Sequence, residues 1–432
     1  MIPLTEMFRI FALLPIFALA LFGQDDPVFK KIPFDQWLKG SDEAHIRFTL
    51  RAMPARLSVH QRMVATVGVE VEGSEFVKRP KSGQVVVFLE IRDHDSRVYR
   101  THRQLTFDDS QKTSTLESIH YQQSVFMAPG DYRVAAAVYD VLSKEHSLKQ
   151  TKLHVPEVAH DPLLEAWRDI PAVEFVSISD PPERWFLPEV TSKLYLPVRN
   201  EKPLRIEVLV NESPTEIAMI RTGRVSTRNM GNLIPALKVI SQLTVGSGSS
   251  LNVQLLDLER RKVSFSQADV KTLDWERLKA ALIENDPNTI DVHALENHEQ
   301  NAQFFVSEIR KRLENTETLQ AEAKRVLIVL SGPMAFPKGQ DLRPIEAAPE
   351  PGSKVFYIRY NPPRSMAQAT GMFGRGGRGM GPPLPMPPRG QSTEDSLART
   401  LKPLSPRMFD VTNPMEFRSA LASIIGEISG LK

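Results

Sequence analysis

A run of polar side chains follows a strongly apolar segment near the middle of the chain. The segment LRIEVLVNESPTEI, residues 204–217, has the pattern of a buried strand and then presents Asn211, Ser213 and Thr215 at alternate positions. Amide and hydroxyl oxygens at this spacing could ligate a hard cation such as Mg²⁺, which prefers oxygen ligands. The same residue types also end strands in polar turns, because their side chains hydrogen-bond to nearby backbone. The segment is therefore a metal site, the remnant of one, or a turn.

Motifs for enzymatic chemistry are missing from the sequence. It contains no HExxH zinc motif and no glycine-flanked serine after a strand. His293 and His298 are five residues apart, a spacing that places them on different faces of a helix. We therefore predict that the protein is not an enzyme and uses no cofactor. A hydrolase acting through Ser213 or Asp291 is the alternative within the enzyme class.

Composition and charge exclude several classes of protein. The chain has 432 residues, enough for two or three domains, and its 41% hydrophobic and 25% charged residues are typical of a globular protein. Its 54 Lys and Arg are balanced by 52 Asp and Glu, so the charge does not favour nucleic-acid binding. The absence of cysteine excludes disulfides and thiolate metal sites.

The first 23 residues have the pattern of an export signal. Residues 10–22 form a run of 13 apolar residues, which is shorter than the roughly 20 that a membrane-spanning helix needs. Ala18 and Ala20 supply the small residues of a cleavage site. We expect a cleaved signal peptide and a periplasmic or extracellular mature protein with no membrane span; an uncleaved N-terminal anchor is the alternative.

Residues 44–157 favour a β-sandwich. About seven short segments alternate apolar and polar residues, with turn residues between them and no helical periodicity. The segment MAPGDYRVAAAVYD resembles the tyrosine corner of immunoglobulin-like and fibronectin-like domains, with Tyr132 as its tyrosine. A plain hairpin with a buried tyrosine explains this segment equally well. The Pro-rich residues 158–200 are predicted to be a linker.

The sequence pattern changes at residue 202. Continuous apolar strands alternate with amphipathic helices through residues 202–432, which predicts a doubly wound, mostly parallel, Rossmann-like sheet with helices on both faces. In the closing segment NPMEFRSALASIIGEI we expect Asn413 to cap a helix that has Pro414 at its first position. Residues 361–396, rich in Gly, Pro, Arg and Met, form a predicted disordered insertion.

The order of these elements resembles a von Willebrand factor type A (VWA) domain, and is similar to the VWA-related domain proteins of acidobacteria. The resemblance covers about residues 204–432. It rests on four segments: RIEVLVNESPT, NTIDVHAL, RVLIVLSG and RMFDVTNPMEFRSALASI.

The resemblance implies where a metal-ion-dependent adhesion site would lie. Its ligands correspond to Asn211, Ser213, Thr215, Thr289 and Ser331. Asn211 and Ser331 stand where the family has aspartates, so both carboxylates are missing. Because Mg²⁺ loses its waters reluctantly and neutral oxygens compensate poorly for that loss, we predict a degenerate site without metal.

Two nearby acids are not expected to replace the two missing aspartates of the implied metal site. Glu212 lies between two ligand positions and is expected to point away from them, and Asp291 begins a helix, where an acid is ordinary. The predicted function is therefore a non-enzymatic exported protein that binds a protein partner through its VWA-like domain without metal. The alternatives are a structural envelope component that assembles through residues 361–396, and a Mg²⁺-dependent adhesion protein.

Overall fold

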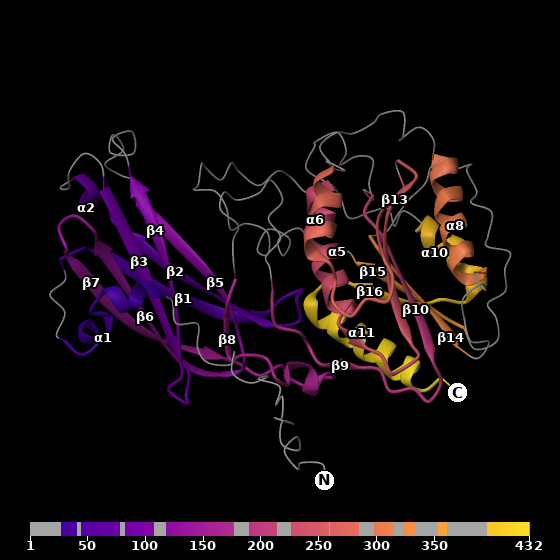
Figure 1. Ribbon diagram of the computed structural model, residues 1–432, viewed down its shortest axis with the longest axis horizontal. Helices are drawn as coiled ribbons and strands as arrows, with labels where there is room; N and C mark the ends of the chain where they lie inside the picture. Colours follow the sequence, from indigo (N-terminus) through magenta and orange to yellow (C-terminus); the bar gives the residue numbers. More distant parts are fainter. Residues whose placement is uncertain are drawn as a thin grey trace, which may run out of the picture. The chain divides into compact units, whose positions relative to one another are not determined.

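The structure is a computed structural model and describes most of the chain (Figure 1). The described residues are 27–40, 45–77, 83–107, 118–176, 190–213, 226–258, 260–284, 298–314, 323–332, 353–360 and 395–431. The predicted signal peptide and the predicted insertion up to residue 394 lie outside them, so both stay predictions. In the described part, no helix is long and apolar enough to cross a membrane.

The chain divides into two compact units whose segments interleave. The first contains Met1–Leu50, Val69–Ile119 and Asp131–Leu153, and the second contains Arg51–Gly68, His120–Gly130 and His154–Lys432. The predicted domains, 44–157, 158–200 and 202–432, group the segments differently and stay a prediction.

A four-stranded sheet in the order β4-β3-β6-β7 dominates the first unit. Its strands are β3 (Gly83–Arg92), β4 (Val98–Phe107), β6 (Gly130–Asp140) and β7 (His146–Val155). Strand β3 pairs antiparallel with both β4 and β6. The short helices η1 (Pro27–Lys31) and α1 (Phe34–Trp37) place Phe29 and Phe34 in an apolar cluster with Phe88. The short helix α2 (Gly73–Val77) also lies in this unit.

A second four-stranded sheet, in the order β1-β2-β5-β8, belongs mainly to the second unit. Its strands are β1 (Phe48–Leu57), β2 (Met63–Val71), β5 (Ile119–Met127) and β8 (Val173–Phe175). Burial alternates along β2, as expected for a strand with one covered face. Strand β8 comes from the segment predicted as a linker and pairs antiparallel with β5.

A six-stranded sheet organises the rest of the second unit, in the order β13-β12-β10-β14-β15-β16. Its strands are β10 (Leu204–Asn211), β12 (Ser250–Asp257), β13 (Lys262–Gln267), β14 (Lys324–Ser331), β15 (Lys354–Tyr360) and β16 (Arg407–Val411). Strand β10 runs parallel to β12 and β14, and β15 runs parallel to β14 and β16. Strand β13 pairs antiparallel with β12.

Helices cover the two faces of this sheet with separate apolar clusters. One face, called the α11 face, packs against α5 (Ser226–Ile240), α6 (Trp275–Glu284) and α11 (Pro414–Ser429). The other, called the α8 face, packs against α8 (His298–Glu314) and α10 (Ser396–Leu401). Because side chains alternate along a strand, Val208 and Val210 lie on the α11 face and Leu209 on the α8 face. The remaining short elements are η2 (Leu164–Trp167), β9 (Leu196–Pro197), β11 (Leu243–Thr244) and η3 (Lys402–Leu404).

The predicted fold class, an immunoglobulin-like or fibronectin-like sandwich followed by a doubly wound Rossmann-like sheet, is wrong for this chain. The structure is mostly β-strand, with sheets of antiparallel strands and 26% helix. The prediction was of a mostly parallel sheet and of a linker over residues 158–200. Instead β12 turns directly into its antiparallel neighbour β13, and the predicted linker supplies a strand to another sheet.

A buried ion pair and a helix cap hold α11 in place within the second unit. The side chain of Arg418 is 0% exposed; its guanidinium pairs with Asp161 at 2.7 Å and lies 4.7 Å from the ring centre of Trp167. At the start of the same helix, the Asn413 side chain accepts hydrogen bonds from the backbone N–H groups of Met415 and Glu416. The predicted cap is therefore confirmed.

Candidate functional site

The polar residues singled out from the sequence come together at one edge of the six-stranded sheet. Asn211 is the last residue of β10 and Ser331 the last of β14, and these strands are parallel neighbours. Both side chains are almost fully buried. The carboxyl ends of parallel strands are a common place for ligands in open sheets, so this edge is the candidate site.

Hydrogen bonds within this group use its oxygen atoms internally. The Asn211 amide nitrogen donates to the Ser331 hydroxyl at 3.0 Å, and that hydroxyl donates to the Gly332 carbonyl at 2.7 Å. The Asn211 amide oxygen accepts the backbone N–H of Ser213 at 3.0 Å. The Ser213 hydroxyl accepts the backbone N–H of Leu258 at 2.7 Å. Each side chain therefore closes a strand end or a turn.

This arrangement does not fit a divalent cation. Asn211 turns its N–H group toward Ser331, and the carboxylates that would compensate for dehydration of Mg²⁺ are absent from both positions. Thr215 and Thr289, the other two residues of the implied site, lie outside the described residues. Within the described part of the chain, no three His, Cys, Asp or Glu side chains cluster as metal ligands would.

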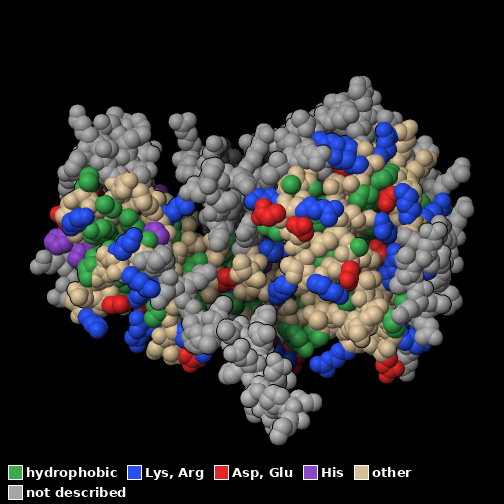
Figure 2. Space-filling model, in the orientation of Figure 1, with side chains coloured by type: hydrophobic (Ala, Val, Ile, Leu, Met, Phe, Trp, Pro, Cys, Tyr) green, Lys and Arg blue, Asp and Glu red, His purple; other side chains and the backbone are tan. Residues whose placement is uncertain are grey.

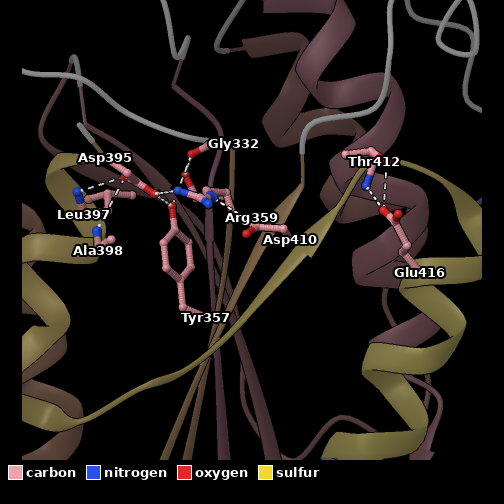
Figure 3. A network of polar contacts seen from close by, with 10 residues as sticks. Gly332, Tyr357, Arg359, Asp395, Leu397, Ala398, Asp410, Thr412 and Glu416 are labelled. Atoms are coloured by element: carbon pink, nitrogen blue, oxygen red, sulfur yellow. Dashed lines mark hydrogen bonds and ion pairs between the residues drawn. The ribbon is translucent and has the colours of Figure 1, made fainter. Parts of the chain in front are cut away.

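The hydrogen-bonded chain continues from Gly332 to β15 and α10 (Figure 3). The Tyr357 hydroxyl lies 3.0 Å from a carboxylate oxygen of Asp395 and 3.5 Å from the Gly332 carbonyl. Arg359 pairs with the same oxygen of Asp395 at 3.4 Å and also with Asp410 on β16. Burial and the Asp395 charge raise the pKa of Tyr357 well above its usual value, so the phenol keeps its proton and donates a hydrogen bond to the carboxylate.

Asp395 is the centre of this polar network, because it also caps α10. Its other carboxylate oxygen accepts the backbone N–H groups of Leu397 and Ala398. Bonding to Asp410 is the largest cause that raises the pKa of Arg359. The network therefore joins Asn211 to the exposed carboxylate of Asp410. The residues between them are, in order of contact, Ser331, Gly332, Tyr357, Asp395 and Arg359.

The α11 face of the same edge has a different character. Glu212 follows β10 directly and is 8% exposed. Burial raises its pKa to about 7, with the neighbouring Asp257 carboxylate as the next cause. The Ser264 hydroxyl bonds to it, but its Oε1 atom has no hydrogen-bond partner among the described residues. Such a buried, uncompensated oxygen is destabilising unless something else binds it.

Tyr360, the last residue of β15, is a second buried polar group on this face. It is 3% exposed, and its ring meets the Phe417 ring edge-on at 5.7 Å. Its hydroxyl has no hydrogen-bond partner in the part of the chain that the structure describes. Burial alone raises its pKa.

Sequence reasoning missed Tyr357, Arg359 and Asp395. The alternation in KVFYIRY marks Tyr357 and Arg359 as facing one side of a strand, and Asp395 before SLARTL has the form of a helix cap. Nothing in the sequence, however, connects Asp395 to β15 across the intervening insertion.

Comparisons with known proteins do not place the chain in a family. No protein-family model matches it, and no curated protein matches it. A solved structure titled Northeast Structural Genomics Consortium target SoR45 is 12% identical, with a TM-score of 0.19 over 28% of this chain and 94% of that one. A β-glucosidase from Listeria innocua in complex with isofagomine is 12% identical, with a TM-score of 0.16 over 26% of this chain and 16% of that one. These likenesses are too weak to carry an argument.

Proposed function

We propose that this protein is an exported, non-enzymatic binding protein, which contacts a protein partner at the carboxyl edge of its six-stranded sheet without a divalent metal. The observation that carries the proposal is the internal bonding of Asn211, Ser213 and Ser331. Their oxygens cap the protein's own backbone, so contact with a partner uses ordinary surface complementarity.

The surface and the site chemistry support a protein partner over other ligands. On the face shown in Figure 2, basic and acidic side chains are interspersed, which does not favour a polyanion. The polar network at the edge holds its groups in place by packing and hydrogen bonds, and such preorganisation favours binding.

Site-specific photocrosslinking tests both parts of this proposal. A photoreactive amino acid replaces the exposed Arg261, in the turn that follows β12 at the carboxyl edge. The matched control carries it at the exposed Glu201, just before the amino end of β10. Each purified variant is incubated with envelope and extracellular fractions, with either Mg²⁺ or EDTA.

We expect a crosslinked protein partner at position 261 and none at position 201, with equal yield in Mg²⁺ and in EDTA. A crosslink that requires Mg²⁺ would contradict the metal-free part of the proposal. Absence of any crosslink from the carboxyl edge would contradict the binding function.

A further inference from the structure

The turn between β1 and β2, residues 58–62, packs against other parts of the second unit. Its backbone closes on itself, because the Gln61 N–H donates to the Ser58 carbonyl at 2.9 Å and Gln61 has a left-handed φ of 58°. Gln61 is 0% exposed, and Val59 belongs to the apolar cluster of the α11 face. The turn therefore joins the sheet β1-β2-β5-β8 to the helices that cover the six-stranded sheet.

Hydrogen bonds attach this turn to α11 and to η2. The Gln61 side chain donates to the carbonyl of Pro414, the first residue of α11, at 3.0 Å. The Gln61 carbonyl accepts the Trp167 indole N–H at 2.7 Å and an N–H of the Arg418 guanidinium at 3.4 Å. If the turn opened, these groups would lose their partners together, so its contacts form and break as one set.

The turn also carries a buried ion pair. The Arg62 guanidinium pairs with Oε2 of Glu174 on β8. Oε1 of Glu174 accepts the backbone N–H groups of Thr191 and Ser192 and the Thr191 hydroxyl, at 2.7, 3.3 and 2.7 Å. Because each carboxylate oxygen has about two lone pairs, Oε1 is saturated. The Glu174 carboxylate is therefore fully engaged by Arg62 and the residues around 191.

His60, in the middle of the turn, lies among positive charges. Its ring meets the Phe126 ring edge-on at 5.4 Å, and the Arg62 guanidinium lies 5.1 Å from the centre of the same ring. Burial is the largest cause that lowers the pKa of His60, to about 3, and the charges of Lys238 and Arg62 lower it further. The Glu174 charge opposes them without outweighing them. The imidazole is therefore neutral while the turn is closed.

We propose that the β1–β2 turn is an acid-sensitive latch, in which protonation of His60 releases the turn from α11 and from β8. A proton on the imidazole adds a third positive charge beside Arg62 and Lys238, and Glu174 has no free acceptor on Oε1 to balance it. An uncompensated charge is costly in a buried position and stable in water, so the protonated ring favours the open turn.

The pH range of this latch follows from the pKa of His60 in the two states. The open turn binds the proton with the ordinary histidine pKa of about 6.5, and the closed turn with a pKa of about 3. The closed state is fully favoured above pH 6.5 and becomes less stable as the pH falls from 6.5 toward 3. Between pH 7.5 and pH 5.0 the ratio of closed to open turn should fall roughly thirtyfold.

Three acids of the second unit respond to pH differently from His60. Although burial raises it, the paired guanidinium lowers the pKa of Glu174 to about 2 and that of Asp161 below its usual value, so both carboxylates stay charged at pH 5. Burial raises the pKa of Glu212 to about 7, so its effect stabilises the folded protein as the pH falls. Global stability therefore combines opposite effects, and the latch must be measured at the turn itself.

Hydrogen–deuterium exchange of the full-length protein tests the latch at the turn. The peptide that contains residues 58–62 is followed by mass spectrometry at pH 7.5 and at pH 5.0, and protection is the rate expected for an unstructured peptide at that pH divided by the measured rate. We expect roughly thirtyfold lower protection at pH 5.0. Equal protection at the two pH values would overturn the inference. The measurement needs no partner, so its outcome is independent of the proposed function.

Variants assign the response to His60. His60→Gln has no titrating ring, so we expect its protection to differ less than about threefold between the two pH values. His60→Asn takes its place if circular dichroism melting shows that the glutamine protein does not fold. His120→Gln, at an exposed position on β5, is the matched control and should keep the full response of the parent. A thirtyfold response that persists in a folded protein without His60 would contradict the latch.

Discussion

The two faces of one sheet edge treat their buried polar groups in opposite ways. On the α8 face, Asn211, Ser331, Tyr357 and Asp395 form a continuous chain in which each described polar side chain bonds to the next or to backbone. On the α11 face, Glu212 and Tyr360 each keep a buried oxygen without a described partner.

The difference predicts opposite effects of mutation on the stability of the protein at the two faces. A satisfied network contributes to folding, and removing one member leaves the others buried and unpaired. A buried polar group without a hydrogen-bond partner has lost its contacts with water and gained nothing in return, which destabilises the folded protein. Variants on the α8 face should therefore lower stability, and variants on the α11 face should leave it unchanged or raise it.

The largest expected effect comes from removing the centre of the α8-face network. Asp395→Ala deletes the cap of α10 and the acceptor of Tyr357 and Arg359, so we expect a loss of about 3 kcal/mol in the free energy of unfolding, measured by urea denaturation. Asp410→Ala is the control, because its side chain is 63% exposed, and should change stability by less than about 1 kcal/mol. Equal losses of unfolding free energy in the two variants would contradict the central role of Asp395 in the network.

The next largest effect is a gain in stability on replacing Glu212, and it depends on pH. The pKa of Glu212 is raised in the folded protein to about 7 from 4.5, so the folded state holds the proton more strongly and stability falls as pH rises from 4.5 to 7. Glu212→Gln removes this loss and should be about 2 kcal/mol more stable than the parent at pH 8, with little difference at pH 4. Urea denaturation at both pH values measures this, and a variant that is less stable at pH 8 contradicts it.

Tyr357 and Tyr360 lie on the same strand, β15, but on opposite faces of the sheet, so they give a matched comparison. Tyr357→Phe leaves an Asp395 oxygen without its donor and should lower the free energy of unfolding by about 1–2 kcal/mol. Tyr360→Phe removes a hydroxyl that has no described partner, so we expect a change within about 0.5 kcal/mol or a small gain. Thermal and urea unfolding of the two proteins decide the point, and the reverse order would refute the contrast between the faces.

The smallest expected effect is the response to divalent cations. Adding Mg²⁺, Mn²⁺ or Ca²⁺ to the parent protein should leave the melting temperature unchanged, because the oxygens of Asn211, Ser213 and Ser331 bond internally. A bound ion at a hundredfold excess over its dissociation constant would instead stabilise the fold by about 2.7 kcal/mol. A rise in melting temperature that disappears in Asn211→Ala would show that the loop holds metal.

Part of the site could be anticipated from the sequence for a simple reason. Asn211 and Ser331 each follow a continuous apolar run, and the ends of neighbouring parallel strands meet at one edge. The Asn413 cap was predictable as well, because helix caps depend on residues three positions apart. Local chemistry and strand ends are thus readable from residue types alone.

The other parts of the fold and of the site depend on contacts between residues that are far apart in the sequence, which local sequence patterns do not predict. Asp395 lies 38 positions after Tyr357 in the sequence, so only the folded chain reveals that the two side chains are bonded. The fold class was wrong because apolar runs mark strands without giving the direction in which neighbours pair, as for the antiparallel β12 and β13, and because β8 lies in a Pro-rich segment that was predicted to be a linker. Glu212 was set aside as a residue facing away from the candidate ligands, and this reasoning overlooked what lies on the opposite face.

The anchoring of β15 has a practical consequence for protein engineering. Residues 361–394 lie between the end of β15 at Tyr360 and the cap of α10 at Asp395, whose carboxylate bonds to Tyr357 and Arg359 of β15. Both junctions are thus fastened by groups that do not belong to the intervening stretch. A fluorescent reporter or affinity module spliced in at that position is expected to leave the melting temperature of its host intact.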